Sequence, residues 1–524
     1  MRTALFLIVS SLLIAETPIS FGLGEIPQRK WFIEVQKNHH DHGEIDSGIQ
    51  LTLYHVHRTS SSSNLLVRDE ARVQSFNYRR SILKSNTKIH AASTTSSNGA
   101  RSTSRSSATA ASTVLANRAK ANSVGGGVDI GLNPGTSIGV ANYYVKMGLG
   151  TPVNYYDMIV DTGSSLTWLQ CKPCAVYCHP QAGPMYDPST STTHKYVTCS
   201  TSQCSALEAA TLNPPMCSML TNWCLYEASY GDHSYSIGYL TRDTMTLSST
   251  SKPTLPGFVY GCGEDTQGLF GRSAGLIGFA RNSLSLSAQL APKYGYAFAY
   301  CLPTTSTPSS GSSQNRTGIL TIGASLSYNY TNTETLANLA VPYQFTPMIT
   351  DPDDPSLYYL RWTGMTVSGE PLNGVPPLRY RETSTIIDSG TVISRLPTSI
   401  YTALRDVFSQ ALSTTYQKAP SYSILDTCYY YKPKTSTTNH QKELMMKMWL
   451  GVPKVSMIFE GGAELQLGPE NVLLEVTEGV SCLAFSANSD TNGIAIIGNH
   501  QQKTYRIIYD IANSKIGFAA GGCD

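Results

Sequence analysis

Two short stretches of this 524-residue chain share one pattern, and the repeat limits what the chain can fold into more than any other feature does. Residues 160–165 read Val-Asp-Thr-Gly-Ser-Ser, and residues 387–391 read Ile-Asp-Ser-Gly-Thr. Each stretch places an Asp after an apolar run and before a turn of small residues, and the two Asp lie 227 positions apart. A single copy would be weak evidence, because ordinary turns use the same residues. Two copies with matched flanks predict an internal duplication.

A second pair of matched stretches supports the duplication. Residues 275–278 read Gly-Leu-Ile-Gly, and residues 495–498 read Ala-Ile-Ile-Gly. Each follows its Asp turn at a similar distance, 117 residues in the first half and 110 in the second. Two such halves that face each other would bring Asp161 and Asp388 together across a pseudo-twofold axis.

The chemistry of two facing carboxylates explains how an Asp could occupy a buried turn. Burying an unpaired carboxylate is costly, but two neighbouring carboxylates can hold a single proton between them. One member can then act as a base on a water molecule, while the protonated member polarises a carbonyl group. Asp161 and Asp388 are therefore the predicted catalytic pair.

The residues that follow each Asp are suited to holding it in place. Gly163 and Gly390 let the backbone approach closely and bring amides toward the carboxylates. We expect the hydroxyls of Ser164 and Thr391 to bond the outer carboxylate oxygens and fix their orientation. The expected supporting residues are Thr162, Gly163, Ser164, Ser389, Gly390 and Thr391.

The composition favours a β-rich protein. Only 14% of the residues are charged, and the chain has 42 Gly and 31 Tyr, a balance that suits strands and turns. Short runs of Val, Ile, Thr and Tyr between Gly and Pro predict strands. Apolar spacing predicts a helix over Thr398–Leu412 and a weaker one over Ser283–Tyr294. We expect a mostly β fold in two lobes with a cleft between them.

The first 22 residues are typical of a secretory signal peptide, with a basic start and a short apolar core. A retained anchor is the alternative. No later stretch approaches the roughly 20 apolar residues that a transmembrane helix needs, and the end, Gly521 to Asp524, has no hydrophobic tail. We therefore expect a secreted protein without a membrane anchor.

Residues 23–138 differ in charge from the rest of the chain. They carry 14 Lys and Arg against 8 Asp and Glu, a net charge of +6, whereas residues 139–524 have a net charge of −4. A basic helix is predicted from Asn64 to Lys84. The interpretation is a prosegment that is held partly by charge and released when carboxylates protonate in acid. The alternative is a flexible leader whose charge has no target.

Together these motifs make the sequence resemble a pepsin-type aspartic endopeptidase of the plant nepenthesin-like branch, over essentially residues 140–524. The resemblance implies a bilobal fold with an N-terminal lobe over 139–340 and a C-terminal lobe over 341–524. It also implies an acid-active enzyme that is made as a zymogen, acts as a monomer on protein or peptide substrates, and needs no cofactor.

The resemblance extends to a flap, a β-hairpin that covers the cleft and closes its Tyr on the substrate. Tyr230, Gly231 and Asp232 match this motif, and Trp168 matches the Trp that commonly hydrogen-bonds the flap Tyr. The alternative for both aromatic residues is a place in the core. His233 stands where the family commonly has Gly, and a titratable ring there could alter the pH dependence, although an inconsequential exposed substitution is the simpler interpretation.

Twelve cysteines begin only at Cys171, and an even number in a secreted chain predicts disulfides. The spacing from Cys171 to Cys174 also fits zinc, but no matching second motif follows, and we expect no metal site. The resemblance implies six pairs: Cys171–Cys174, Cys178–Cys262, Cys199–Cys224, Cys204–Cys217, Cys301–Cys523 and Cys428–Cys482. Asn315 and Asn329 lie in acceptor motifs for N-linked glycans.

Two other classes of function are weighed against a protease. Xylanase inhibitors of the same superfamily resemble the enzymes but have lost parts of the catalytic pattern, whereas this chain keeps both Asp turns and the flap Tyr. Nucleic-acid binding, suggested for some plastid relatives, is disfavoured because a net charge of −4 over residues 139–524 repels phosphates. The vacuole and the plastid remain alternatives to the extracellular space.

Overall fold

The computed structural model of the protein describes residues 66–80 except 68, 75 and 78, and most of the chain from 128 onward. The described ranges in that second part are 128–230, 234–247, 253–304, 318–323, 343–352, 354–431, 451–488 and 493–521. The expected signal peptide, Gly231, Asp232, His233, Asn315, Asn329 and Cys523 lie outside the described residues. The described residues all belong to one unit of the chain, residues 58–524.

The first Asp turn stands at the end of a buried strand. Strand β3 (Asn154–Asp161) changes from partly exposed residues to a fully buried run as it approaches Asp161. Strand β10 (Gly275–Gly278) pairs parallel to it and places Gly278 opposite Asp161. Strand β4 (Trp168–Gln170) pairs antiparallel with β10, and β2 (Tyr143–Leu149) pairs with the other edge of β3. The turn is thus fixed from both sides.

The second half repeats this arrangement. Strand β17 (Thr385–Ile387) ends just before Asp388 and pairs parallel with β26 (Ala495–Ile497). Strand β18 (Ser394–Leu396) meets β26 in the antiparallel sense. The two stretches matched in the sequence, 275–278 and 495–498, therefore play the same part beside the two Asp turns.

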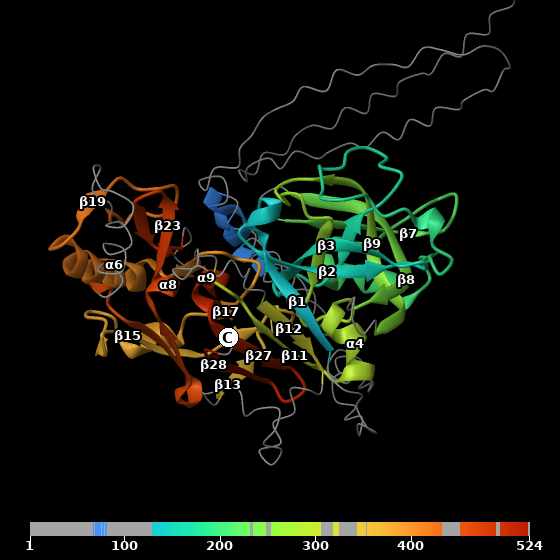
Figure 1. Ribbon diagram of the computed structural model, residues 1–524. Coiled ribbons are helices and arrows are strands. Elements are labelled where there is room, and N and C mark those ends of the chain that lie inside the picture. Colours follow the sequence, from blue (N-terminus) through green and yellow to red (C-terminus); the bar gives the residue numbers. More distant parts are fainter. Residues whose placement is uncertain are drawn as a thin grey trace, which may run out of the picture. The chain divides into compact units, whose positions relative to one another are not determined.

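A shared sheet joins the two halves, which Figure 1 shows in green and red. Strand β11 (Ala297–Cys301) pairs antiparallel with β27 (Tyr505–Asp510). Strands β12 (Gly318–Ile322) and β1 (Val128–Pro134) extend the sheet on one side, while β28 (Lys515–Ala520) and β13 (Gln344–Ile349) extend it on the other. Strand β1, which lies within the expected prosegment 23–138, is thus part of this sheet.

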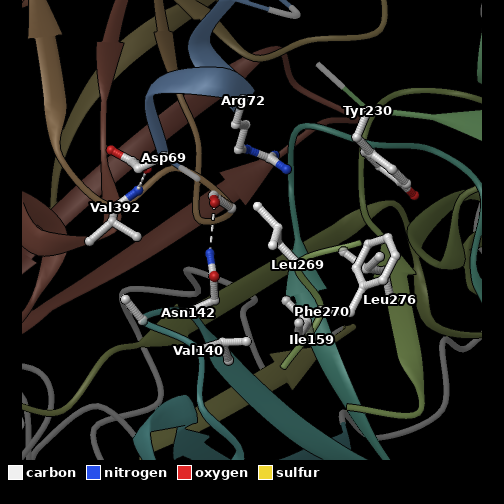
Figure 2. A pocket seen from close by; sticks show the side chains of 12 residues that line it. Asp69, Arg72, Val140, Asn142, Ile159, Tyr230, Leu269, Phe270, Leu276 and Val392 are labelled. Carbon is white, nitrogen blue, oxygen red and sulfur yellow. Dashed lines mark hydrogen bonds between the residues drawn. The ribbon is translucent and has the colours of Figure 1, made fainter. Parts of the chain in front are cut away.

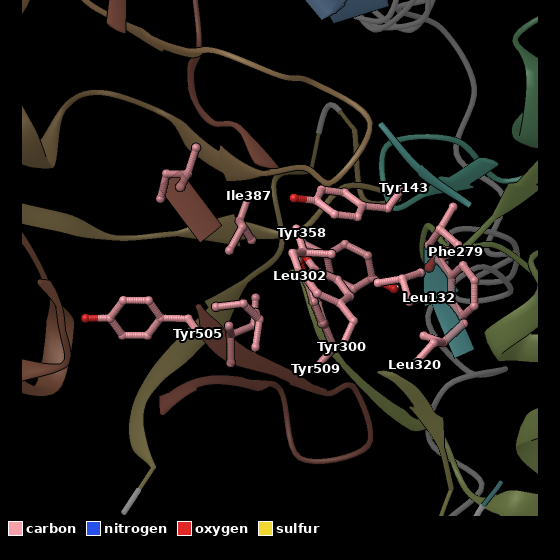
Figure 3. Close-up of a cluster of buried hydrophobic side chains, with 14 of the residues drawn as sticks. Leu132, Tyr143, Phe279, Tyr300, Leu302, Leu320, Tyr358, Ile387, Tyr505 and Tyr509 are labelled. Carbon is pink, nitrogen blue, oxygen red and sulfur yellow. Dashed lines mark hydrogen bonds between the residues drawn. The ribbon is translucent and has the colours of Figure 1, made fainter. Parts of the chain in front are cut away.

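Aromatic side chains pack where the two halves meet (Figure 3). Phe298 of β11 stacks on Tyr509 of β27 with ring centroids 4.5 Å apart. The hydroxyls of Tyr300 and Tyr509 lie 2.7 Å apart, and both rings are buried. This core fixes the position of one half relative to the other, and therefore of one Asp turn relative to the other.

The remaining elements complete each half. In the first half they are η1 (Gly135–Ile138), η2 (Pro188–Thr190), β5 (Lys195–Tyr196), α2 (Ser202–Ser205), α3 (Leu207–Thr211), β6 (Met216–Cys217), β7 (Cys224–Ser229), β8 (Tyr235–Thr246), β9 (Thr254–Gln267) and α4 (Leu286–Tyr294). In the second half they are β14 (Tyr359–Leu360), β15 (Trp362–Val367), β16 (Glu370–Pro371), α5 (Pro377–Arg381), α6 (Thr398–Ser413), β19 (Gln417–Ala419), β20 (Cys428–Tyr430), β21 (Val455–Phe459), η4 (Glu460–Gly462), β22 (Glu464–Leu467), α8 (Pro469–Val472), β23 (Leu473–Thr477), β24 (Val480–Leu483), β25 (Phe485–Ala487) and α9 (Asn499–Gln502).

Both helices predicted from apolar spacing are present. Helix α6 spans Thr398–Ser413 and buries Ile400, Leu404 and Phe408 on one face. Its N-cap is Pro397, and no side chain caps its first turn. Helix α4 spans Leu286–Tyr294 and is capped by the Ser285 side chain. The described residues include no helix long and apolar enough to span a membrane.

Segment 66–80 is helical, as the sequence predicted for this region, and is drawn in blue in Figure 1. Leu66, Val73 and Phe76 of this segment are buried, at most 5% exposed, whereas Val67 is exposed. Val73 and Phe76 pack with Ile386 beside the second Asp turn. The segment is therefore docked at the Asp turns.

Candidate active site

The two Asp carboxylates are fully buried, and the backbone holds each in the same way. The amide of Gly163 donates to Oδ1 of Asp161 at 2.9 Å, and the amide of Gly390 donates to Oδ1 of Asp388 at 3.0 Å. A Cβ at either Gly would lie within 3 Å of the opposite Asp carboxylate. Only Gly therefore lets the two turns approach this closely.

The residues after each Asp tie the two turns to each other. The amide of Ser389 donates to the Thr162 hydroxyl at 2.8 Å, and the Ser389 hydroxyl donates to the Val160 carbonyl at 3.1 Å. The amide of Thr162 completes the exchange with Ser389 Oγ at 3.2 Å. These bonds are buried and cross from one half to the other, so they fix the separation of the carboxylates.

The two hydroxyls expected on the outer carboxylate oxygens differ. Thr391 donates to Oδ2 of Asp388 at 2.6 Å, as predicted. The hydroxyl of Ser164 is buried and bonds no described residue, so the predicted bond to Asp161 is absent here. The Arg72 guanidinium bonds this carboxylate instead, with Nη1 3.2 Å from Oδ2 of Asp161.

Arg72, from segment 66–80, lies between the two carboxylates. Its Nη2 is 2.5 Å from Asp161 Oδ1 and 3.0 Å from Asp388 Oδ2. Its Nε donates to Asp388 Oδ2 at 3.1 Å and to Thr391 Oγ1 at 3.3 Å. Burial by itself lowers the pKa of Arg72, but the two carboxylates outweigh burial and raise that pKa above its ordinary value. One cation thus bridges both members of the pair.

Further polar contacts hold the segment at both ends. At its C-terminal end, Arg79 Nε lies 2.5 Å from Asp354 Oδ2, and Arg79 Nη2 donates to Ser356 at 2.7 Å. At its N-terminal end, the buried Asp69 carboxylate accepts from the amides of Val392 and Ile393 at 2.5 and 3.0 Å. Burial raises the pKa of Asp69, and the charge of Arg395 together with these amides opposes that rise.

A cavity of about 70 Å³ lies beside Asp69 and Arg72, and Figure 2 shows its lining. Tyr230 and Phe270 line it from the first half, and Val392 from the second. Asn142 spans the two halves, because its side-chain amide donates to the Gly390 carbonyl at 2.6 Å. The cavity is part of a cleft that the segment only partly fills.

The aromatic pair expected at the flap is present. The indole of Trp168 donates to the Tyr230 hydroxyl at 2.8 Å, and Trp168 is fully buried. Phe270 packs edge-on against both rings. Tyr230 directly follows β7 (Cys224–Ser229), and β8 (Tyr235–Thr246) pairs with β7 as a hairpin. Tyr230 therefore stands at the end of this hairpin, beside the cavity.

Four of the predicted disulfides are wrong. The structure has Cys171–Cys262 and Cys174–Cys178 in place of Cys171–Cys174 and Cys178–Cys262. It has Cys199–Cys217 and Cys204–Cys224 in place of Cys199–Cys224 and Cys204–Cys217. Cys428–Cys482 is as predicted, and Cys301 is disulfide-bonded, although its expected partner Cys523 is not described.

Strand pairing explains the first correction. Strand β4, which directly precedes Cys171, runs parallel to β9 and pairs Leu169 with Cys262. Cys171 therefore meets Cys262 across the sheet, with Cα atoms 5.4 Å apart, and Cys174 is left to Cys178. Because both sulfurs of each bridge are oxidised, these cysteines are not zinc ligands, and the described residues contain no cluster of three or more His, Cys, Asp or Glu suited to a metal.

The sequence interpretation missed three residues of the site: Arg72, Asp69 and Asn142. A signal for the first two was present, since residues 69, 72, 76 and 79 recur at helical spacing in the predicted basic helix. Nothing in the sequence linked this helix to the Asp turns residue by residue. Asn142 precedes β2 as an ordinary loop residue, so its contact with Gly390 could not be anticipated.

Comparison with known proteins agrees with the fold and the Asp turns. Two family models match most of the folded body, described as xylanase inhibitor N-terminal over residues 143–324 and xylanase inhibitor C-terminal over residues 357–520. Together with the relatives below, these matches show the class: the chain belongs to the plant family of pepsin-like aspartic proteases.

Individual relatives carry protease names. An aspartyl protease family protein of Arabidopsis thaliana is 39% identical over 75% of this chain and 75% of its own length. Aspartic proteinase nepenthesin-2 of Nepenthes gracilis is 33% identical over 74% of this chain and 78% of its own length. Among solved structures, basic 7S globulin from soybean has a TM-score of 0.55 and is 19% identical, covering 76% of this chain and 97% of its own, a likeness of fold alone.

Proposed function

We propose that the protein is an acid-active aspartic endopeptidase made as a zymogen. The observation that carries the proposal is the pair of buried carboxylates, Asp161 and Asp388, held by matching backbone amides and bridged by a single guanidinium nitrogen. A water molecule in the place of that nitrogen would contact both carboxylates. Such a water is the nucleophile that hydrolysis of a peptide bond requires.

In the proposed mechanism the ionised carboxylate takes a proton from this water as its oxygen attacks the peptide carbonyl carbon. The protonated carboxyl group donates a hydrogen bond to the carbonyl oxygen, where negative charge develops. A proton is then delivered to the amide nitrogen as the C–N bond breaks. The bonds between Thr162 and Ser389 keep the two carboxylates in place during these transfers.

Tyr230 and Trp168 are proposed to act as the flap pair. The Trp168 indole fixes the Tyr230 hydroxyl at 2.8 Å, so the Tyr230 ring is held at the cavity beside the dyad. A ring held in this way would exclude water from the substrate and position it over the carboxylates.

Segment 66–80 is the proposed inhibitory part of the leader. Arg72 occupies the place of the nucleophilic water, and the side chains of Val73 and Phe76 are buried beside the second Asp turn. Acid would weaken this arrangement at Arg72, because protonating the dyad removes the charges that the guanidinium binds. Asp69 acts in the opposite sense: its pKa is raised in the docked segment, so protonation of this residue favours docking.

The alternative is a protease-like binding protein without catalysis. The matching family models, which are described as xylanase inhibitor, are consistent with this alternative. The retained dyad, both turn glycines, Thr391 and the flap Tyr favour the enzyme. We propose protein or peptide substrates, no cofactor, a monomer, and secretion, with the vacuole or plastid as alternative destinations.

The test compares the wild-type protein with Asp161→Asn and Asp388→Asn variants. Each variant is processed in trans by tagged wild-type protein that is then removed, so that failure to self-process is not mistaken for loss of catalysis. Cleavage of a denatured protein at low pH should be lost in both variants and inhibited in the wild type by a statine-containing peptide. Asp406→Asn, on the exposed face of α6, is the matched control. Undiminished cleavage by either dyad variant would rule out this mechanism.

A further inference from the structure

Arg395 is a buried cation whose counter-charges come from the leader. The residue lies on β18, seven positions after Asp388, and its side chain is fully buried. Nη2 lies 3.0 Å from Oδ2 of Asp69, and Nε lies 3.1 Å from Oε2 of Glu70. Nη1 donates to the Ile393 carbonyl at 2.7 Å. Among the described residues, the carboxylates paired with Arg395 are these two alone.

Asp69 shows that this part of the cleft receives a carboxylate. The amides of Val392 and Ile393 donate to its two oxygens, and Figure 2 shows Asp69 directed at Val392 beside the cavity. A guanidinium and two convergent amides on one carboxylate make a site built for an anion. The site adjoins the dyad, because Val392 is separated from Asp388 by only three residues and lines the same cavity as Gly390.

Removal of the leader leaves this site without its anion. The cation of Arg395 would then keep the Ile393 carbonyl but lose both carboxylates, and the two amides would lose Asp69; a buried charge without a counter-charge is strongly unfavourable. The body of the protein supplies no described carboxylate to replace Asp69 and Glu70. The site is thus incomplete in the processed protein until another anion enters the cleft.

Resting on the proposed peptidase function, we propose that Arg395 determines specificity: the processed enzyme prefers peptides that place an Asp or Glu side chain against Arg395. In the docked helix Asp69 precedes Arg72 by three residues, about 4.5 Å along the helix axis. An extended peptide covers about 3.3 Å per residue, so the acidic residue should lie within about three residues of the bond that is cut. Arg395 contacts the substrate and takes no part in the bond cleavage.

The experiment uses the processed wild-type enzyme and a neutral peptide that it cleaves. Each of the three residues on either side of the cleaved bond is replaced in turn by Asp and by the uncharged isostere Asn. At pH 5, where a free Asp is ionised, we expect kcat/KM to be about tenfold or more higher for Asp than for Asn at one position, the size expected of a charge-assisted hydrogen bond. A ratio near one at all six positions overturns the proposal.

The variant Arg395→Gln should bring that ratio to about one, while Arg395→Lys should keep part of it. Arg361→Gln, at an exposed Arg of the same half, is the matched control and should leave the ratio unchanged. An acidic preference that survives in Arg395→Gln also overturns the proposal.

A measurement on the wild type alone keeps the proposal testable if Arg395 variants fail to fold. Cysteic acid, whose sulfonate stays ionised at both pH 5 and pH 2.5, should be preferred over Asn at the same position as Asp is. A cysteic acid peptide that is cleaved no better than the Asn peptide contradicts the role of charge. Failure of the proposed peptidase function is distinguishable, because the neutral peptide itself would then not be cleaved.

Discussion

Replacing Arg72 with Gln should open the active site of the unprocessed protein. The Arg72 side chain is 16% exposed, both carboxylates are fully buried, and the guanidinium makes its hydrogen bonds to Asp161, Asp388 and Thr391. Removing one partner of a buried ion pair costs about 3–5 kcal/mol, which corresponds to roughly a 100- to 5,000-fold change in the docking equilibrium of segment 66–80. We expect the lower end of this range, because the freed carboxylates can share a proton.

The assay is the affinity of the full-length protein for a statine-containing peptide, measured near pH 6 with intact mass confirming that no processing has occurred. In the wild type the segment competes with the peptide, so Arg72→Gln should lower the apparent Kd by about 100-fold. Gln74→Ala is the matched control on the same segment, since the Gln74 side chain is exposed. Its effect should stay within about threefold, as expected for an exposed substitution.

Processing provides the second control. Once the leader has been removed, wild type and Arg72→Gln are the same protein, so their Kd values must agree. If the unprocessed Arg72→Gln protein binds the peptide no more tightly than the unprocessed wild type, Arg72 does not block the dyad, and the proposed mode of inhibition is wrong.

Three further predictions concern the flap, a buried His and the disulfides. Trp168→Phe, which removes the 2.8 Å hydrogen bond to Tyr230, should lower kcat/KM about fivefold in steady-state assays and leave the cleavage sites unchanged, because one such hydrogen bond contributes about 1 kcal/mol. An unchanged kcat/KM would show that Trp168 does not support the flap. Burial and the neighbouring Lys503 hold the pKa of His500 well below its ordinary value, so the unfolded state binds more protons below about pH 6.5 and stability falls as the pH falls. The free energy of unfolding is measured by chemical denaturation between pH 7 and 4.5, in an Asp388→Asn background that prevents self-cleavage. Its dependence on pH should be shallower by about 1.4 kcal/mol per pH unit in His500→Asn than in the protein that keeps His500. Equal slopes would contradict the assignment. Replacing both Cys171 and Cys262, which are 91 residues apart, by Ser should reduce the free energy of unfolding by roughly 4.6 kcal/mol. The same change at Cys174 and Cys178, which are 4 residues apart, should reduce it by roughly 1.9 kcal/mol. The reverse order would show that loop closure does not govern the contribution of these bridges to stability.

The sequence by itself determined the class of fold and the two central residues. Duplication leaves a repeated pattern in the chain, and the flanks of Asp161 and Asp388 carry it because a buried strand, a turn and a glycine are each local requirements. Helix α6 and the helix in segment 66–80 could be predicted for the same reason, because the spacing of their residues is a local feature of the chain. Local periodicity predicts which elements form.

Only the tertiary structure decided which elements meet. The Cys171–Cys262 bridge followed from the parallel pairing of β4 with β9, which no spacing of cysteines in the chain reveals. The Asp161 oxygen that was predicted to bond Ser164 instead accepts from Arg72, which lies 92 residues before Ser164 in the chain. Nothing in the sequence pointed to Arg395, because its place opposite Asp69 depends on how a distant helix docks. Contacts between segments far apart in sequence depend on packing and charge in three dimensions, and one sequence carries no local record of them.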